Sequence, residues 1–129
     1  MTDAYSKSPL VKKLAIKPKT RITVVNAPEG YRELLGELPP ETTYVEKFDG
    51  TFDWIQVFVK TQAEMDQQLP AMKAKLAPNG ILWVAFPRAK KATDLNRNSM
   101  FSLKDNHGLD PVSNVVVNDD WTAYRLKIV

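Results

Sequence analysis

Two near-continuous apolar runs dominate the hydrophobic pattern of this chain. They cover residues 52–59 and 81–86, and neither alternates between apolar and polar positions. A strand has this pattern when both faces of its sheet are covered, as in parallel sheets flanked by helices. The pattern predicts two parallel strands joined by a helix that Pro70 kinks or restarts, with residues 77–80 as the turn into the second strand. Apolar residues recur at helical spacing between the runs, at Met65, Leu69, Met72 and Leu76.

Shorter elements precede and follow this block. The last two predicted strands are joined by residues 118–120 alone, so they form an antiparallel hairpin. The whole pattern predicts a three-layer α/β sandwich with a mostly parallel sheet of about six strands and helices on both faces. The other predicted elements are, in order, a helix from Pro9 that ends by Pro18, a strand over 21–26, a helix carrying Tyr31, Leu34 and Leu35, a strand over 42–46, a helix from about Leu95 to Asn106, and strands over 112–117 and 121–128.

Composition indicates one ordinary globular domain spanning residues 1–129. Hydrophobic residues make up 43% and charged residues 26%, which excludes disordered and collagen-like classes. No apolar run approaches the ~18 residues of a membrane-spanning helix, and the first residues are polar. With no cysteine there are no disulfides or thiolate sites. We therefore expect a cytoplasmic protein without a membrane partner.

Several sequence segments resemble a small bacterial domain family of unknown function, related to class I methyltransferases. The segments are Asn-Ala-Pro-Glu-Gly-Tyr at 26–31, Leu-Ala-Pro-Asn-Gly at 76–80 and Thr-Asp-Leu at 93–95. The resemblance extends over nearly the whole chain. It implies a Rossmann-like fold, shortened after the second strand, in which the 42–46 strand lies at one edge, followed by the 21–26, 52–59 and 81–86 strands and then the hairpin. It implies no agreed activity.

The resemblance also indicates where a ligand would bind. Ligands of open α/β sheets lie at the carboxyl ends of the strands, near the point where the strand order reverses. By resemblance, that point places Asn26 and Glu29 opposite Lys60. A methyltransferase loop needs glycines there, so that the backbone can approach S-adenosylmethionine, whereas this loop has Pro28, which lacks an N–H donor. This favours loss or alteration of cofactor binding, and no cofactor is expected.

Glu46 keeps S-adenosylmethionine in consideration. It lies twenty positions after Asn26, where related folds place an acid that accepts two hydrogen bonds from the ribose hydroxyls. The alternative is an ordinary exposed glutamate at a strand end. The candidate cofactor residues are Asn26, Glu29, Glu46 and Lys60.

A basic loop after the 81–86 strand is the clearest candidate for ligand contact. The following helix begins near Thr93, where free N–H groups and the helix dipole favour an anion. The predicted anion-binding residues are Arg88, Lys90, Lys91 and Thr93. The alternative is a solvated surface, with Asp94 already capping the helix.

No catalytic residue can be assigned from the sequence. His107, the single histidine, precedes Gly108 at a predicted helix end, which favours a structural role. One histidine without cysteines gives no metal site, and Trp54, Trp83 and Phe86 are expected in the core. We predict a non-catalytic methyltransferase-like domain that binds a small anionic molecule or a protein partner. The alternative is an S-adenosylmethionine-dependent small-molecule methyltransferase with an atypical loop. Scattered basic residues argue against nucleic acid.

Overall fold

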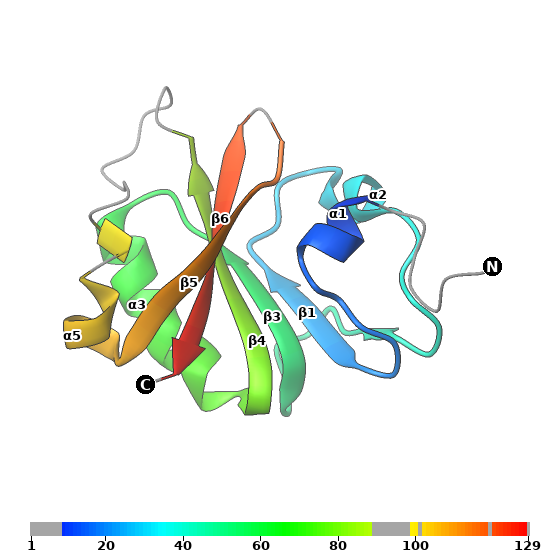
Figure 1. Ribbon diagram of the computed structural model, residues 1–129, viewed down its shortest axis with the longest axis horizontal. Coiled ribbons are helices and arrows are strands. Elements are labelled where there is room, and N and C mark those ends of the chain that lie inside the picture. Colours follow the sequence, from blue (N-terminus) through cyan, green and yellow to red (C-terminus); the bar gives the residue numbers. More distant parts are fainter. Residues whose placement is uncertain (1–8, 89–98, 101, 119, 129) are drawn as a thin grey trace.

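Six strands form one mixed sheet in the computed structural model, which describes residues 9–88, 99–100, 102–118 and 120–128. The strand order is β2-β1-β3-β4-β6-β5. The first four strands are parallel, β6 is antiparallel to β4, and β5 pairs antiparallel with β6 (Figure 1). The predicted fold class and strand order are confirmed. The strands are β1 (Arg21–Val25), β2 (Thr43–Tyr44), β3 (Phe52–Phe58), β4 (Leu76–Pro87), β5 (Leu109–Val116) and β6 (Trp121–Ile128).

Helices cover both faces of the sheet, as the unalternating apolar runs predicted. Helices α1 (Pro9–Lys13) and α2 (Tyr31–Leu35) lie on one side, and α3 (Gln62–Ala74) and α5 (Leu103–His107) on the other (Figure 1). Successive β3 side chains point to opposite faces. Trp54 and Phe58 therefore join the core under α1 and α2, while Ile55 and Val57 join the core under α3 and α5. None of the helices within the described ranges is long and apolar enough to cross a membrane.

Two tryptophans fasten helix α1 to the sheet. The indole N–H groups of Trp54 and Trp83 both donate to the carbonyl oxygen of Leu14, at 2.8 and 2.9 Å. Both side chains are only 1% exposed, so each buried indole donor has its partner. The core position expected for these tryptophans and for Phe86 is confirmed.

Some predicted boundaries differ from the structure. Strand β4 begins at Leu76, which pairs with Phe52, and residues 77–80 then leave the register before Ile81 pairs with Trp54. The predicted turn is thus an excursion inside β4. Helix α3 continues through Pro70 without a restart. Proline has no N–H, so one carbonyl group in the preceding turn of the helix lacks its helical donor. Because Pro70 is exposed, water can reach that carbonyl group.

The second and fifth strands also differ from prediction. Strand β2 keeps only two of the five predicted residues, Thr43 and Tyr44, and pairs with β1 alone. Strand β5 starts three residues earlier than predicted, directly after Gly108, whose φ of 66° ends α5. The first part of the helix predicted from Leu95, residues 95–98, lies outside the described residues.

Candidate functional site

The carboxyl ends of β1 and β3 lie side by side where the strand order reverses. The two strands stay in register up to Val25 opposite Val57. Residues 26–30, which we call the β1 loop, follow, with left-handed backbone at Asn26 (φ 59°) and Gly30 (φ 80°). Asparagine tolerates this conformation better than most non-glycine residues. Asn26 and Glu29 are exposed at this edge, as is Lys60 beyond β3, so the structure brings these three predicted residues to one edge of the sheet.

A buried tyrosine fixes the end of the β1 loop. Tyr31 is 2% exposed, its N–H donates to the Pro28 carbonyl oxygen at 3.1 Å, and its ring meets Phe58 edge to face at 4.7 Å between centroids. Its hydroxyl donates to Oε1 of Gln56, which is fully buried in β3. Burial raises the pKa of Tyr31 well above its usual value, so the hydroxyl stays protonated. Nε2 of Gln56 has no hydrogen-bond partner within the part of the chain that the structure describes.

Glu46 follows β2 beside the second half of β1. The residue before it, Val45, is hydrogen-bonded to β1: its N–H donates to the Ile22 carbonyl oxygen at 2.9 Å, and its carbonyl oxygen accepts from the Thr23 hydroxyl at 2.7 Å. The parallel register of β2 on β1 therefore brings Glu46 level with Val24, and Glu46 also lines a groove of about 650 Å³ together with Arg21, the first residue of β1. The grouping of Glu46 with Asn26, Glu29 and Lys60 stays a prediction.

Two cations follow neighbouring strands at the carboxyl edge. Lys60 comes two residues after β3, and Arg88 comes directly after β4; both are exposed. The two strands stay paired up to Phe58 and Ala85, and the Arg88 N–H donates to the Asp120 carbonyl oxygen at 3.0 Å. Lys60 and Arg88 thus occupy the same edge. The other predicted anion-binding residues, Lys90, Lys91 and Thr93, lie outside the described residues, so that site stays a prediction.

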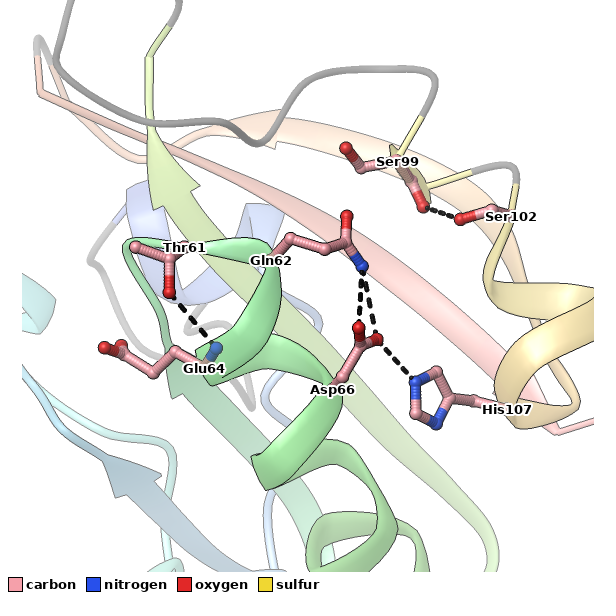
Figure 2. A network of polar contacts seen from close by, with 7 residues as sticks. All are labelled: Thr61, Gln62, Glu64, Asp66, Ser99, Ser102 and His107. Carbon is pink, nitrogen blue, oxygen red and sulfur yellow. Dashed lines mark hydrogen bonds and ion pairs between the residues drawn. The ribbon is translucent and has the colours of Figure 1, made fainter.

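Helix α3 begins at this edge with a capping arrangement. The Thr61 side-chain oxygen accepts from the Glu64 N–H at 3.1 Å (Figure 2). The Glu64 carboxylate reaches back and accepts from the Lys60 N–H, also at 3.1 Å. This reciprocal pattern satisfies N–H groups that would otherwise be open at the helix start. It fixes the backbone of Lys60 and Thr61 just beyond β3.

A polar network on the next turn of α3 was not predicted. Asp66 accepts from Gln62 at 3.2 Å and lies 2.8 Å from Nε2 of His107 (Figure 2). The bond from His107 holds the pKa of Asp66 below its usual value. Lys73 completes the connection by donating to the His107 carbonyl oxygen at 2.9 Å. The network latches α5 to α3, in agreement with the structural role expected for His107.

This latch borders a groove of about 460 Å³ between α3 and α5. One usable signal for the contact was present in the sequence, the spacing of four between Gln62 and Asp66 on a helix. The histidine lies 41 positions further on, so no local pattern connects it to Asp66. In the part of the chain that is described, no three histidine, cysteine or carboxylate side chains gather as a metal site.

Comparison with solved structures agrees with the architecture described above. Similar chains include a ribosomal protein L11 methylase from Lactobacillus delbrueckii subsp. bulgaricus, with TM-score 0.59 and 10% identity over 92% of this chain and 74% of that one. An S-adenosylmethionine-dependent methyltransferase from Aquifex aeolicus has TM-score 0.60 and 14% identity, covering 98% and 91% of the two chains. The N-methyltransferase NodS from Bradyrhizobium japonicum, in complex with S-adenosylhomocysteine, has TM-score 0.59 and 14% identity, covering 91% and 82%.

The identities of 10 to 14% establish a shared fold and nothing finer. At the level of sequence, no protein-family model and no curated protein matches the chain. The fold is thus the Rossmann-like fold of S-adenosylmethionine-dependent methyltransferases.

Proposed function

We propose that this chain is a methyltransferase-like binding domain that transfers no methyl group and takes a small anionic molecule at the carboxyl ends of β3 and β4. The composition of the β1 loop carries the proposal. Glu46 argues for the second candidate described below, because an acid at the end of the second strand reaches the ribose hydroxyls beside the loop after the first strand in nucleotide-binding sheets of this kind. Here Glu46 follows the two-residue strand β2, level with Val24 of β1.

The middle of the β1 loop offers little open backbone. Pro28 has no N–H to donate, and the side chains of Ala27 and Pro28 occupy positions where glycine would let a cofactor approach the backbone. Asn26 supplies the left-handed turn, and Tyr31 holds the far end of the loop against Gln56. Open glycine backbone is present only at Gly30, the last residue of the loop, and this supports a loop that does not hold a nucleotide.

The anionic character of the ligand rests on Lys60 and Arg88. They stand at the ends of adjacent strands, and strands in a sheet are ~4.8 Å apart, so the two residues flank the same stretch of the carboxyl edge. Guanidinium and ammonium groups bind carboxylates and phosphates through charge-assisted hydrogen bonds. Glu29 is acidic and exposed in the β1 loop, so it would disfavour a ligand of high negative charge placed over that loop.

A second candidate is an S-adenosylmethionine-dependent small-molecule methyltransferase with an atypical cofactor loop. The structural likeness to methyltransferases favours it, including one bound to S-adenosylhomocysteine. In this case the β1 loop would contact the cofactor through Asn26 and Glu29, and Lys60 would face the substrate.

Calorimetric titration separates the two candidates. With S-adenosylmethionine and S-adenosylhomocysteine we expect no saturable heat. A Kd in the micromolar range, equivalent to about 8 kcal/mol of binding free energy, would overturn the proposal in favour of the methyltransferase. Citrate and inorganic phosphate serve as anion probes. Their binding should weaken at least tenfold in the variant Lys60→Gln/Arg88→Gln and stay unchanged in Lys47→Gln; equal binding by both variants would refute the anion site.

A further inference from the structure

A further groove lies at the opposite end of the sheet from the carboxyl edge. It holds about 750 Å³ and runs between the excursion of β4 and the end of β6. In Figure 1 this is the lower end of β6, next to the chain end marked C. Its volume falls within the ~300–1,000 Å³ typical of ligand sites. Its lining includes Asn79, Gly80, Val112, Arg125, Lys127 and Ile128.

One wall of the groove is a tightly folded backbone segment. Residues 77–80 leave the β3–β4 register and return to it at Ile81. Asn79 has φ 64°, and a Cβ at Gly80 would lie 2.8 Å from the Ala77 carbonyl oxygen. Such a contact is too short for any side chain, so glycine is required for this fold of the segment. The wall is therefore set by the backbone and exists before any partner binds.

The opposite wall carries apolar side chains exposed to solvent. Val112 is 51% exposed and Ile128 is 42% exposed, although both are large and apolar. Val112 lies at the irregularity in the β5–β6 register between Pro111 and Ser113. Exposed apolar side chains that gather along a groove indicate a contact surface, whereas isolated ones need no explanation.

Two cations make the groove positive. Side chains of Arg125 and Lys127 point to the same face of β6, because alternate residues of a strand share a face. No residue that lines the groove is acidic. Asp110 stands opposite Lys127 in the register, but the two form no ion pair within the described part of the chain. Ile128 shares the other face of β6 with Leu126, so the groove surrounds the end of the strand and offers positive charge on one side and exposed apolar surface on the other.

From this combination we infer that the groove binds an extended segment of a partner protein in which carboxylates flank an aliphatic side chain. The carboxylates meet Arg125 and Lys127, and the aliphatic side chain packs on Val112 and Ile128. Charge complementarity of this kind selects the partner and makes its association sensitive to salt. The inference is independent of the ligand proposed at the carboxyl edge, since the two sites share no residue.

The probe is a fluorescently labelled peptide of alternating glutamate and valine, titrated by anisotropy against the full chain tagged at its N-terminus. We expect saturable binding with a Kd below about 1 mM that weakens as salt is raised. The variant Arg125→Gln/Lys127→Gln should lose at least tenfold in affinity. The control Lys13→Gln/Lys47→Gln removes the same charge from exposed positions elsewhere and should stay within twofold.

A charge-reversed variant distinguishes loss of binding from loss of folding. The variant Arg125→Glu/Lys127→Glu should bind a peptide of alternating lysine and valine that the unmodified chain does not bind. Three results would overturn the inference: no binding of the glutamate peptide, equal loss in the control variant, or no gain for the reversed pair. Preferential binding of a fatty-acid carboxylate over the glutamate peptide would overturn it too, since the groove would then serve a small amphiphile.

Discussion

Replacing Tyr31 by phenylalanine removes one hydroxyl group from the core and leaves Oε1 of Gln56 without its donor. Nε2 of Gln56 already lacks a partner among the residues that the structure describes, and Gln56 is fully buried in β3. The substitution would therefore leave a whole buried amide unpaired. An orphaned buried polar group costs about 1–3 kcal/mol, so we expect Tyr31→Phe to lower the free energy of unfolding by about that amount.

The reciprocal change and the double variant test this reasoning. Gln56→Met keeps the length of the side chain, removes the unpaired Nε2 and orphans the Tyr31 hydroxyl, so its cost should be smaller, about 0–2 kcal/mol. The variant Tyr31→Phe/Gln56→Met has neither polar group and should come within about 1 kcal/mol of the unmodified chain. The double variant then loses less stability than the two single variants lose together, and this difference is the coupling energy between the two positions.

Urea unfolding followed by tryptophan fluorescence and circular dichroism measures these differences. Equal slopes with denaturant would show that the variants unfold from comparable native states. Phe58→Leu, which changes the ring packed on Tyr31 without touching the hydrogen bond, is the matched control and should couple to Gln56→Met less strongly than Tyr31→Phe does. If the two single costs simply added in the double variant, the buried pair would not be energetically linked and the reasoning would be refuted.

Three further predictions concern other described contacts. Trp83→Phe removes one of the two indole donors to Leu14 and some buried ring area, and should lower the free energy of unfolding by about 2–4 kcal/mol in urea. A cost under about 0.5 kcal/mol would contradict a stabilising role for this hydrogen bond. The contact with His107 lowers the pKa of Asp66 in the native state. The contact therefore stabilises the fold at pH values above the carboxyl's ordinary pKa of about 4, and this stabilisation is lost as the pH falls through the native pKa. Asp66→Asn should therefore be less stable than the unmodified chain at neutral pH, with the difference shrinking in acid; a difference independent of pH would exclude this linkage. Pro70→Ala restores a backbone donor inside α3 at an exposed position and should raise the free energy of unfolding by up to about 3 kcal/mol, whereas a loss of stability would show that the helix needs the proline.

The fold could be predicted because the signals that define it are local. Near-continuous apolar runs at 52–59 and 81–86 predict helices on both faces, and the three-residue connection at 118–120 permits only a hairpin. The extent of β2 could not be predicted, since its β-branched residues suit a longer strand and only Thr43 and Tyr44 pair with β1. Likewise, composition does not show that the segment 77–80 is an excursion within a strand.

The candidate site was harder to predict because its contacts join distant parts of the chain. The sequence indicated Asn26, Glu29 and Lys60 from the expected strand order, and the structure places all three at one edge. It also indicated Glu46 by its spacing of twenty positions after Asn26, and the grouping of Glu46 with these three residues stays a prediction. The Asp66–His107 contact depends on how α5 packs on α3, for which the sequence carries no periodic signal.

The central proposal is that the β1 loop does not bind an adenosyl cofactor. The most direct measurement is a nuclear magnetic resonance titration of the labelled chain with S-adenosylhomocysteine, following the backbone amides of Asn26, Ala27, Glu29, Gly30 and Tyr31. Our account predicts that these five amides keep their chemical shifts up to about 1 mM ligand. Saturable shifts confined to these amides and to Lys60 would contradict it and identify the carboxyl edge as a working cofactor site.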